Sequence, residues 1–114
     1  GKKKIIILDA AMNDLMRPAL YGAFHRTLPV TKSNKISNKT YEFVGPICES
    51  TDKFIKLKKF QKLKEKDLIA ICDVGAYGMS LSSNYNLRPK PIELLIKGSK
   101  INIIRKRQKH TEII

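Results

Sequence analysis

Residues 91–105 read PIELLIKGSKINIIR, in which two aliphatic runs flank the dipeptide Gly98-Ser99. Two strand-like runs separated by two residues, one of them glycine, are typical of a β-hairpin. We therefore expect strands at Pro91–Lys97 and Lys100–Arg105 that pair antiparallel. The preceding segment, Arg88-Pro89-Lys90-Pro91, is a rigid basic turn that leads into the first of these strands.

Three segments upstream also have the composition of short strands. Leu68–Asp73, Thr40–Ile47 and Lys4–Leu8 are runs rich in apolar or β-branched residues, bounded by polar or turn-forming residues. Lys4–Leu8 is expected to be buried, because its aliphatic residues are consecutive. Several short strands with little helix predict a mainly β fold, an antiparallel, Greek-key-like β-barrel or sandwich.

One helical segment is expected near the N-terminus, at Asp14–His25. Apolar residues recur there at three- and four-residue spacing, and Asn13 or Asp14 is suited to cap the first turn. Pro18 is tolerated only if the helix begins close to it, and Gly22 weakens the middle. The helix should therefore be short or irregular.

Length and composition limit the number of domains and the compartment. The chain has 114 residues, of which 42% are hydrophobic, which is enough for one packed core and too short for two domains. It contains no apolar run of about 18 residues, so we expect no membrane span. The apolar run Ile5–Leu8 is shorter than the roughly 7–15 residues of a secretory signal, which favours a cytoplasmic protein.

The formal net charge of +13 first suggests nucleic acid as a partner, because lysine and arginine contact phosphates. Lysine supplies 18 of the 23 basic residues, whereas bidentate recognition of bases and phosphates favours arginine. The densest run, Lys53–Lys66, has seven lysines, one carboxylate and several apolar residues. We favour a solvated face whose lysine stems cover the core, and keep a small basic nucleic-acid-binding module as the alternative.

The two cysteines, Cys48 and Cys72, have neither a CxxC spacing nor neighbouring histidines, so we expect no metal site. Cys72 lies within an apolar run and is expected to be a small buried core residue. Cys48 lies at the polar turn Gly45–Asp52, from which side chains can reach outward. A thiol next to Glu49 is a candidate proton donor, because a charged neighbour tunes its pKa.

Two further groups of polar residues are candidates for binding a ligand. Arg17 and Tyr21 are four residues apart on the expected helix, so a forked cation and a phenol share one face. The pair suits a carboxylate or phosphate, although spacing alone favours a surface arginine stacked on a tyrosine. Tyr77 lies between Gly75 and Gly78, and hydroxyl and amide side chains follow it, as in a loop that binds phosphate or another polar ligand.

Four motifs, taken in chain order, resemble the C-terminal part of the pyridoxal-phosphate-dependent ornithine/diaminopimelate/arginine decarboxylases. They are LDAAMNDLMRPALY (8–21), GPICESTD (45–52), DVGAYGMS (73–80) and SNYNLRP (83–89). The resemblance covers nearly the whole chain. The Cys-Glu dipeptide and the Gly-Ala-Tyr-Gly turn together resemble the motifs of the members that act on diaminopimelate. Ornithine and arginine decarboxylases are expected to have Cys-Asp instead at the turn Gly45–Asp52, called the thiol turn below.

The resemblance implies a two-domain, alanine-racemase-like enzyme in which residues 1–114 are the C-terminal β-domain. An N-terminal (β/α)8 barrel, absent from this chain, would hold pyridoxal 5′-phosphate on a Schiff-base lysine. The implied lyase reaction converts meso-2,6-diaminopimelate to L-lysine and CO2 in lysine biosynthesis. The implied assembly is a head-to-tail homodimer with shared active sites, and no nucleic-acid or membrane partner is expected.

The family's functional residues have counterparts in the four motifs. By resemblance, Cys48 is the catalytic proton donor and reaches into the partner's site. Arg17 and Tyr21 would bind the substrate carboxylate, and Glu49 would bind the distal ammonium. Tyr77 would contact the substrate and the cofactor phosphate. The resemblance implies no metal ligand.

Two departures from the family pattern bear on these expectations. Ala11 stands where the family usually has glycine, a small change that is expected to shift packing. The cofactor lysine, stacking histidine and glycine-rich phosphate loop of the barrel have no match in the sequence. We therefore expect no covalent cofactor binding and no turnover by this chain alone. A piece that assembles with a separately supplied barrel is a further alternative.

Overall fold

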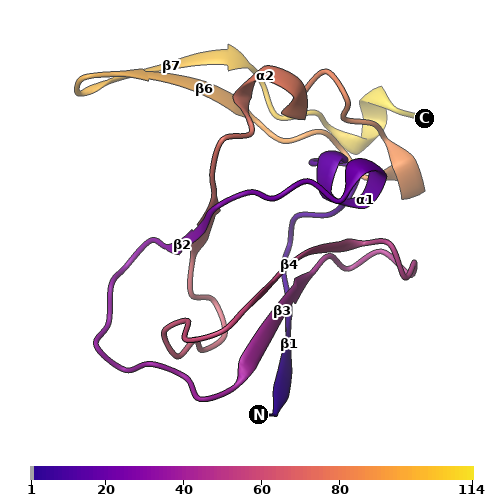
Figure 1. The fold of residues 1–114 in the computed structure, drawn as a ribbon. Coiled ribbons are helices and arrows are strands. Elements are labelled where there is room, and N and C mark those ends of the chain that lie inside the picture. Colours follow the sequence, from indigo (N-terminus) through magenta and orange to yellow (C-terminus); the bar gives the residue numbers. More distant parts are fainter. Residues whose placement is uncertain (1) are drawn as a thin grey trace.

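The computed structural model describes residues 2–114, which form short strands and single-turn helices (Figure 1). In chain order the elements are β1 (Lys3–Ile7), α1 (Arg17–Tyr21), β2 (Thr27–Pro29), β3 (Thr40–Val44), β4 (Lys53–Leu57), β5 (Ile69–Ile71), α2 (Gly75–Gly78), the 3₁₀ helix η1 (Tyr85–Leu87), β6 (Glu93–Lys97), β7 (Lys100–Arg105) and the 3₁₀ helix η2 (His110–Glu112). The expected mainly β composition is confirmed. None of the helices in the described part of the chain is long and apolar enough to cross a membrane.

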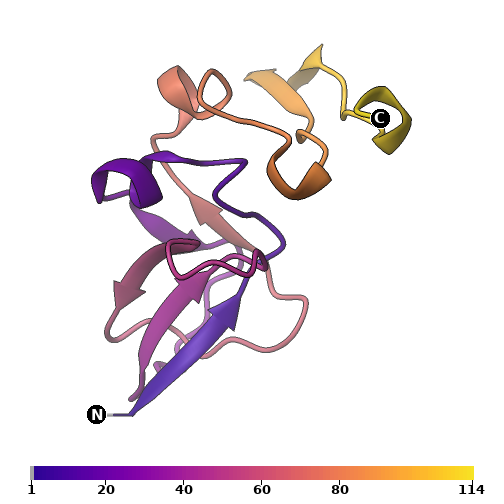
Figure 2. The same cartoon turned by 90° about the vertical axis from the view of Figure 1, so that its right-hand side faces the viewer.

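The strands form three small sheets, and within residues 2–114 they do not close into one barrel. β3 is the central strand of the largest sheet, parallel to β1 and antiparallel to β4. β2 pairs antiparallel with β5, and β6 pairs antiparallel with β7. The parallel pairing of β1 departs from the antiparallel expectation, because the long connection through α1 and β2 returns the chain to the starting end before β3 begins. In side view α1 lies above the β1–β3–β4 sheet, and α2 and the β6–β7 hairpin lie above α1 (Figure 2).

The core lies on one face of β3 and is mainly aromatic. Tyr41 and Phe43 are 2% and 0% exposed, and their ring centroids lie 6.1 and 5.2 Å from that of Phe60. These distances fall within the range that stabilises aromatic pairs beyond their buried area. The buried cluster also contains Leu15 and Phe54. Since side chains alternate along a strand, Glu42 lies on the opposite face of β3.

Glu42 is a buried charge, with a relative exposure of 3%. Its carboxylate oxygens lie 3.0 Å from Lys3 Nζ, 3.4 Å from Lys56 Nζ and 3.7 Å from Lys53 Nζ. The hydrogen bond from Lys3 contributes most to holding the pKa of Glu42 below its ordinary value, and it outweighs the opposing effect of desolvation. Lysines from β1 and β4 therefore converge on one carboxylate of the strand between them.

Local backbone chemistry explains where the first helix departs from expectation. Pro18 lies in the first turn of α1, and Gly22 ends the helix in the left-handed conformation at φ 64°. The helix is therefore short, as expected, but shorter than the apolar periodicity indicates. The expectation that Asn13 or Asp14 caps it is wrong, because Met16 is at the N-cap position and makes no side-chain cap.

The lysine-rich run Lys53–Lys66 begins with a strand, β4, that its residue pattern does not predict. In β4, Phe54 is 9% exposed while Lys53 and Lys56 are exposed. Further along, Phe60 is 8% exposed. The aromatic residues of this run thus face the core and its lysines face outward, which agrees with the expected solvated face.

β1 is exposed, contrary to the expectation that Lys4–Leu8 is buried. Ile5 and Ile7 are 56% and 69% exposed. β1 is an edge strand of its sheet, and a groove of about 710 Å³ runs between it and residues 63–71. The aliphatic run is therefore suited to contact with protein outside residues 2–114.

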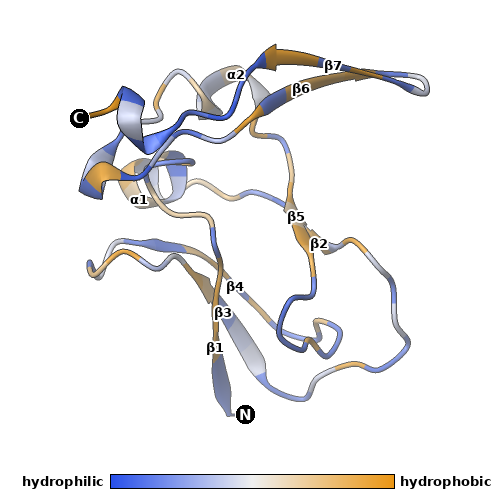
Figure 3. Ribbon diagram, turned by 180° about the vertical axis from the view of Figure 1, so that it is seen from behind, coloured by the Kyte–Doolittle hydropathy of each residue, from blue (hydrophilic) through white to orange (hydrophobic). Residues whose placement is uncertain are grey.

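The β6–β7 hairpin confirms the expected strand pairing but extends away from the rest of the chain (Figure 3). Its cross-strand pairs Leu94–Ile103 and Ile96–Ile101 form one aliphatic face. These four side chains are 43–65% exposed. A two-stranded hairpin with an uncovered apolar face is typical of a surface that another protein segment covers.

Replacing Glu42 with Gln should lower the free energy of unfolding by about 1–2 kcal/mol near pH 7, because the ion pairs with three lysines are lost. The folded-state pKa of Glu42 is lowered, so its stabilising effect is present above the unfolded-state pKa and is lost as the pH falls through the folded-state value. The free energies of unfolding of the two proteins, measured with denaturant, should therefore differ near pH 7, and the difference should shrink as the pH falls through the folded-state pKa of Glu42. Glu112→Gln is the control, since Glu112 is exposed and makes no ion pair within the described residues; equal effects of the two substitutions would contradict the prediction.

Candidate active site

A buried aspartate joins the turn that carries Cys48 to the turn that precedes α1. The Asp52 side chain is 2% exposed; its Oδ2 accepts a hydrogen bond from Ile47 N at 2.8 Å and its Oδ1 accepts one from Met12 N at 2.7 Å. A Cβ on Gly45 would collide with this carboxylate, so only glycine fits at that position. The thiol turn is therefore held by the carboxylate of its last residue, Asp52.

A second buried network joins the turn before α1 to the segment 83–88. Asn13 is 0% exposed; its Nδ2 donates to Ser83 O at 3.2 Å, and its Oδ1 accepts from Arg88 Nε at 2.9 Å. Arg88 Nη2 also donates to Asp9 O at 2.7 Å. Burial raises the pKa of Asp14, and the Ala11 N–H and the Arg88 guanidinium oppose that rise. Arg88, expected only to lead into a strand, thus joins two motifs that are distant in sequence.

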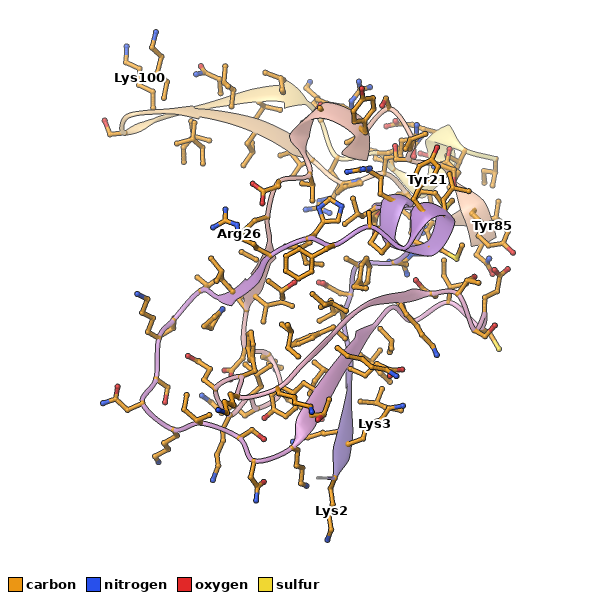
Figure 4. The ribbon with its side chains drawn as sticks, in the orientation of Figure 1. Lys2, Lys3, Tyr21, Arg26, Tyr85 and Lys100 are labelled. Carbon is orange, nitrogen blue, oxygen red and sulfur yellow. The ribbon has the colours of Figure 1, made fainter. Side chains whose placement is uncertain are left out.

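α1 and α2 bring together two of the predicted site residues. The Arg17 guanidinium lies over the Tyr77 ring, 5.9 Å from its centroid, a distance typical of a cation–π contact. Tyr21 is 66% exposed and projects from α1 (Figure 4). Spacing alone favoured stacking of this arginine on a tyrosine nearby in the sequence. In the structure the ring under Arg17 is instead that of Tyr77, from a distant motif.

Tyr77 lies on a single helical turn where a close approach by another group is sterically allowed. Its side chain is 61% exposed, and within the described residues its hydroxyl makes no hydrogen bond. A Cβ on Gly75 would meet nothing within 4 Å, so packing inside this chain does not require glycine there. A free phenol beside an uncrowded glycine and the Arg17 cation fits an incoming phosphate or carboxylate.

Cys48 and Glu49 are both exposed on the β3–β4 turn, which agrees with the expected outward direction of the thiol. Within residues 2–114 neither side chain makes a hydrogen bond or ion pair, and none joins them to Arg17, Tyr21 or Tyr77. Cys72 is a free thiol that is half-buried, where full burial was expected. Nor do His, Cys, Asp and Glu in the described chain form a group that could hold a metal ion.

Within residues 2–114 the candidate residues therefore form two sets that no hydrogen bond or ion pair joins. Arg17, Tyr21 and Tyr77 make one set at α1 and α2, and Cys48 and Glu49 make the other on the thiol turn. The sequence motifs identified these residues but missed the roles of Asn13 and Asp52. Asn13, expected as a helix cap, instead joins the turn before α1 to residues 83–88, and Asp52 holds the thiol turn. Their place inside two of the motifs was the available signal, because short polar side chains often bond nearby backbone groups.

Comparison with protein families matches residues 1–75 to the model described as "Pyridoxal-dependent decarboxylase, C-terminal sheet domain". The diaminopimelate decarboxylase of Archaeoglobus fulgidus is 40% identical over 114 residues, covering 100% of this chain and 27% of that protein. The Helicobacter pylori diaminopimelate decarboxylase is 46% identical over 106 residues, covering 93% of this chain and 26% of that protein. The chain thus spans about a quarter of the length of these relatives.

Solved structures give the same family. The H. pylori diaminopimelate decarboxylase in complex with L-lysine aligns with a TM-score of 0.86 at 46% identity, covering 97% of this chain and 27% of that one. The enzyme of M. jannaschii, also with L-lysine, aligns with a TM-score of 0.89 at 36% identity, covering 96% and 25%. A lysine decarboxylase from Selenomonas ruminantium, 22% identical with a TM-score of 0.61, shares the fold. These comparisons do not support the nucleic-acid-binding alternative.

Gly45→Ala should destabilise the chain by about 2–3 kcal/mol, because the added methyl group would overlap the buried Asp52 carboxylate. Gly75→Ala is the matched control: its methyl group would meet open space on a helical turn, so stability should change by less than about 1 kcal/mol. Denaturant midpoints of the two variants provide the measurement. Equal midpoints would show that Asp52 does not hold the thiol turn as described.

Proposed function

The chain belongs to the pyridoxal-dependent decarboxylase family, and from this premise we propose that it is the C-terminal domain of a diaminopimelate decarboxylase. Residues 1–114 would be the β-domain, and a (β/α)8 barrel would supply the remainder of the enzyme. The proposed reaction is decarboxylation of meso-2,6-diaminopimelate to L-lysine and CO2. Coverage of only 26–27% of the relatives' length supports a further domain.

The observation that carries this proposal is that similarity to this chain differs between relatives named for different substrates. Identity to the H. pylori diaminopimelate decarboxylase is 46% with a TM-score of 0.86, whereas the S. ruminantium lysine decarboxylase has 22% and 0.61. The first alignment covers 97% of this chain and the second 75%. Greater similarity over a longer stretch favours diaminopimelate as the substrate.

The uncovered surfaces of the chain support a barrel and a second subunit as partners. The aliphatic edge of β1 and the Leu94/Ile96/Ile101/Ile103 face of the hairpin expose side chains that are normally covered in an assembled protein. The separation of the candidate residues into two sets supports a head-to-tail homodimer. In such a dimer, Cys48 and Glu49 of one subunit would complete the site that contains Tyr77 of the other.

Tyr77 and its surroundings fit the phosphate of pyridoxal 5′-phosphate. The exposed phenol would donate a hydrogen bond to a phosphate oxygen, and the open space at Gly75 would let the phosphate approach the backbone. When bound, the cofactor withdraws electrons from the substrate carbon that loses CO2. The lysine that holds the cofactor covalently would lie in the barrel.

The chain's own side chains would bind the substrate and move one proton. Arg17 and Tyr21 would bind a substrate carboxylate by a charge-assisted hydrogen bond and a phenolic hydrogen bond, and Tyr77 under Arg17 would limit the motion of that guanidinium. Glu49 would pair with the distal ammonium of the substrate. Cys48 Sγ would then donate a proton in place of the departed carboxylate.

A reduced Cys48 is required for that role, which favours a cytoplasmic enzyme. Both cysteines of the chain are free thiols in the structure. The proposed cytoplasmic location therefore rests on the proposed role of the Cys48 thiol as a proton donor.

A chimera tests the proposed function directly. We would replace the corresponding C-terminal segment of the H. pylori enzyme, 46% identical to this chain, with residues 1–114 and measure L-lysine formation from meso-diaminopimelate. The chimera should be active, and Cys48→Ser should lower kcat by about 10²–10³ because the hydroxyl is a much weaker acid than the thiol. The 114-residue chain alone, incubated with pyridoxal phosphate, should form no lysine adduct and no product.

Cys72→Ser is the matched control, because Cys72 is the other free thiol of the chain. It directly follows β5 and is not part of the thiol turn. It should leave kcat within about threefold of the parent chimera. An inactive chimera that still shows the cofactor absorbance of a folded barrel, or equal losses from both cysteine variants, would contradict the proposal.

A further inference from the structure

A hollow lined by lysines lies away from the candidate active site. Its volume is about 560 Å³, and its walls come from residues 31–35, between β2 and β3, and residues 61–68, between β4 and β5. Figure 1 shows these two loops on the side of the chain opposite α1 and the β3–β4 turn. The candidate active site therefore does not account for this hollow.

Five lysines and one aspartate line the hollow. The lysines are Lys32, Lys35, Lys62, Lys64 and Lys66. Asp67 forms an ion pair with Lys64 at 3.3 Å, and the Lys64 backbone N–H that donates to it holds its pKa below the ordinary value. Within residues 2–114 the other four lysines have no carboxylate partner. Glu65 lines the adjoining groove and not this hollow.

The lysines of the sheet face have different surroundings. There, Glu42 lies within 3.7 Å of three ammonium groups and offsets part of their repulsion. The five lysines that line the hollow are exposed, so solvent and salt screen the repulsion between their ammonium groups only in part. A bound anion with several charges would remove it.

One side chain holds the two walls of the hollow together. Gln61 Nε2 donates to Thr31 O at 2.8 Å, and Gln61 Oε1 accepts from Ser33 N at 2.9 Å. Lys62 N also donates to Lys35 O at 2.8 Å. The two loops are therefore joined before any ligand binds, which reduces the entropy that binding would cost.

We propose that this hollow is a binding site for a compact anion that carries two or more phosphate groups. Its volume lies within the range of small-molecule sites, about 300–1,000 Å³. Lysine ammonium groups bind phosphate as point charges, and the hydroxyls of Thr31 and Ser33 supply neutral donors on the same wall. A single-stranded nucleic acid is less suitable, because no aromatic side chain lines the hollow to stack on a base.

Titration calorimetry of the 114-residue chain with inorganic tripolyphosphate tests this proposal. We expect saturable binding of one equivalent, tighter than binding of orthophosphate. The combined substitution Lys32→Gln, Lys35→Gln and Lys62→Gln should weaken it by about tenfold or more, since each lysine removed takes away a charge-assisted contact. Gln61→Leu should also weaken binding although it leaves the net charge unchanged.

The matched control removes three positive charges elsewhere, by Lys97→Gln, Lys100→Gln and Lys106→Gln in and just after the β6–β7 hairpin. This control should keep the dissociation constant within about threefold, because screened charges at a distance contribute little. Circular dichroism of every variant checks the fold. Equal weakening by both triple variants, binding of several equivalents, or binding of a single-stranded RNA oligonucleotide but not of tripolyphosphate would overturn the proposal.

Discussion

The Asp52 carboxylate, almost fully buried, accepts hydrogen bonds from Ile47 N in its own turn and from Met12 N in the turn that precedes α1. Cys48 and Glu49 lie between Ile47 and Asp52, so the position of both reactive groups depends on this side chain. The requirement for glycine at position 45 has the same origin, because the carboxylate fills the space of a Cβ. The chain thus uses one buried charge, satisfied by backbone donors, to hold exposed functional groups on a short loop.

The parts of the fold that sequence predicted are those set by local chemistry. Gly98-Ser99 between two aliphatic runs was sufficient for the β6–β7 hairpin, and Pro18 with Gly22 was sufficient for a short α1. The contact between Arg17 and Tyr77 joins residues distant in sequence, and no periodicity reports such a pair. The exposure of β1 was missed for a different reason: an aliphatic strand looks the same in sequence whether its cover comes from its own chain or from another protein segment.

Two groups among the 18 lysines have different surroundings. Lys3, Lys53 and Lys56 surround Glu42 on the outer face of the β1–β3–β4 sheet and contribute to stability there. The five lysines of the loop hollow share one carboxylate, Asp67, which pairs with Lys64. The chain-wide value of +13 cannot distinguish these groups, because it counts charges without regard to their neighbours.

The central claim of the proposed function is that Cys48 and Glu49 complete the active site of a second subunit. The most direct measurement mixes two inactive chimeras, one with Cys48→Ala and the other lacking the cofactor lysine of the H. pylori barrel, under conditions in which subunits exchange. If sites are shared, half of the dimers contain one intact site, and activity should recover to about a quarter of the parent value. Activity that stays at the level of the separate variants, although mixed dimers form, would contradict the claim.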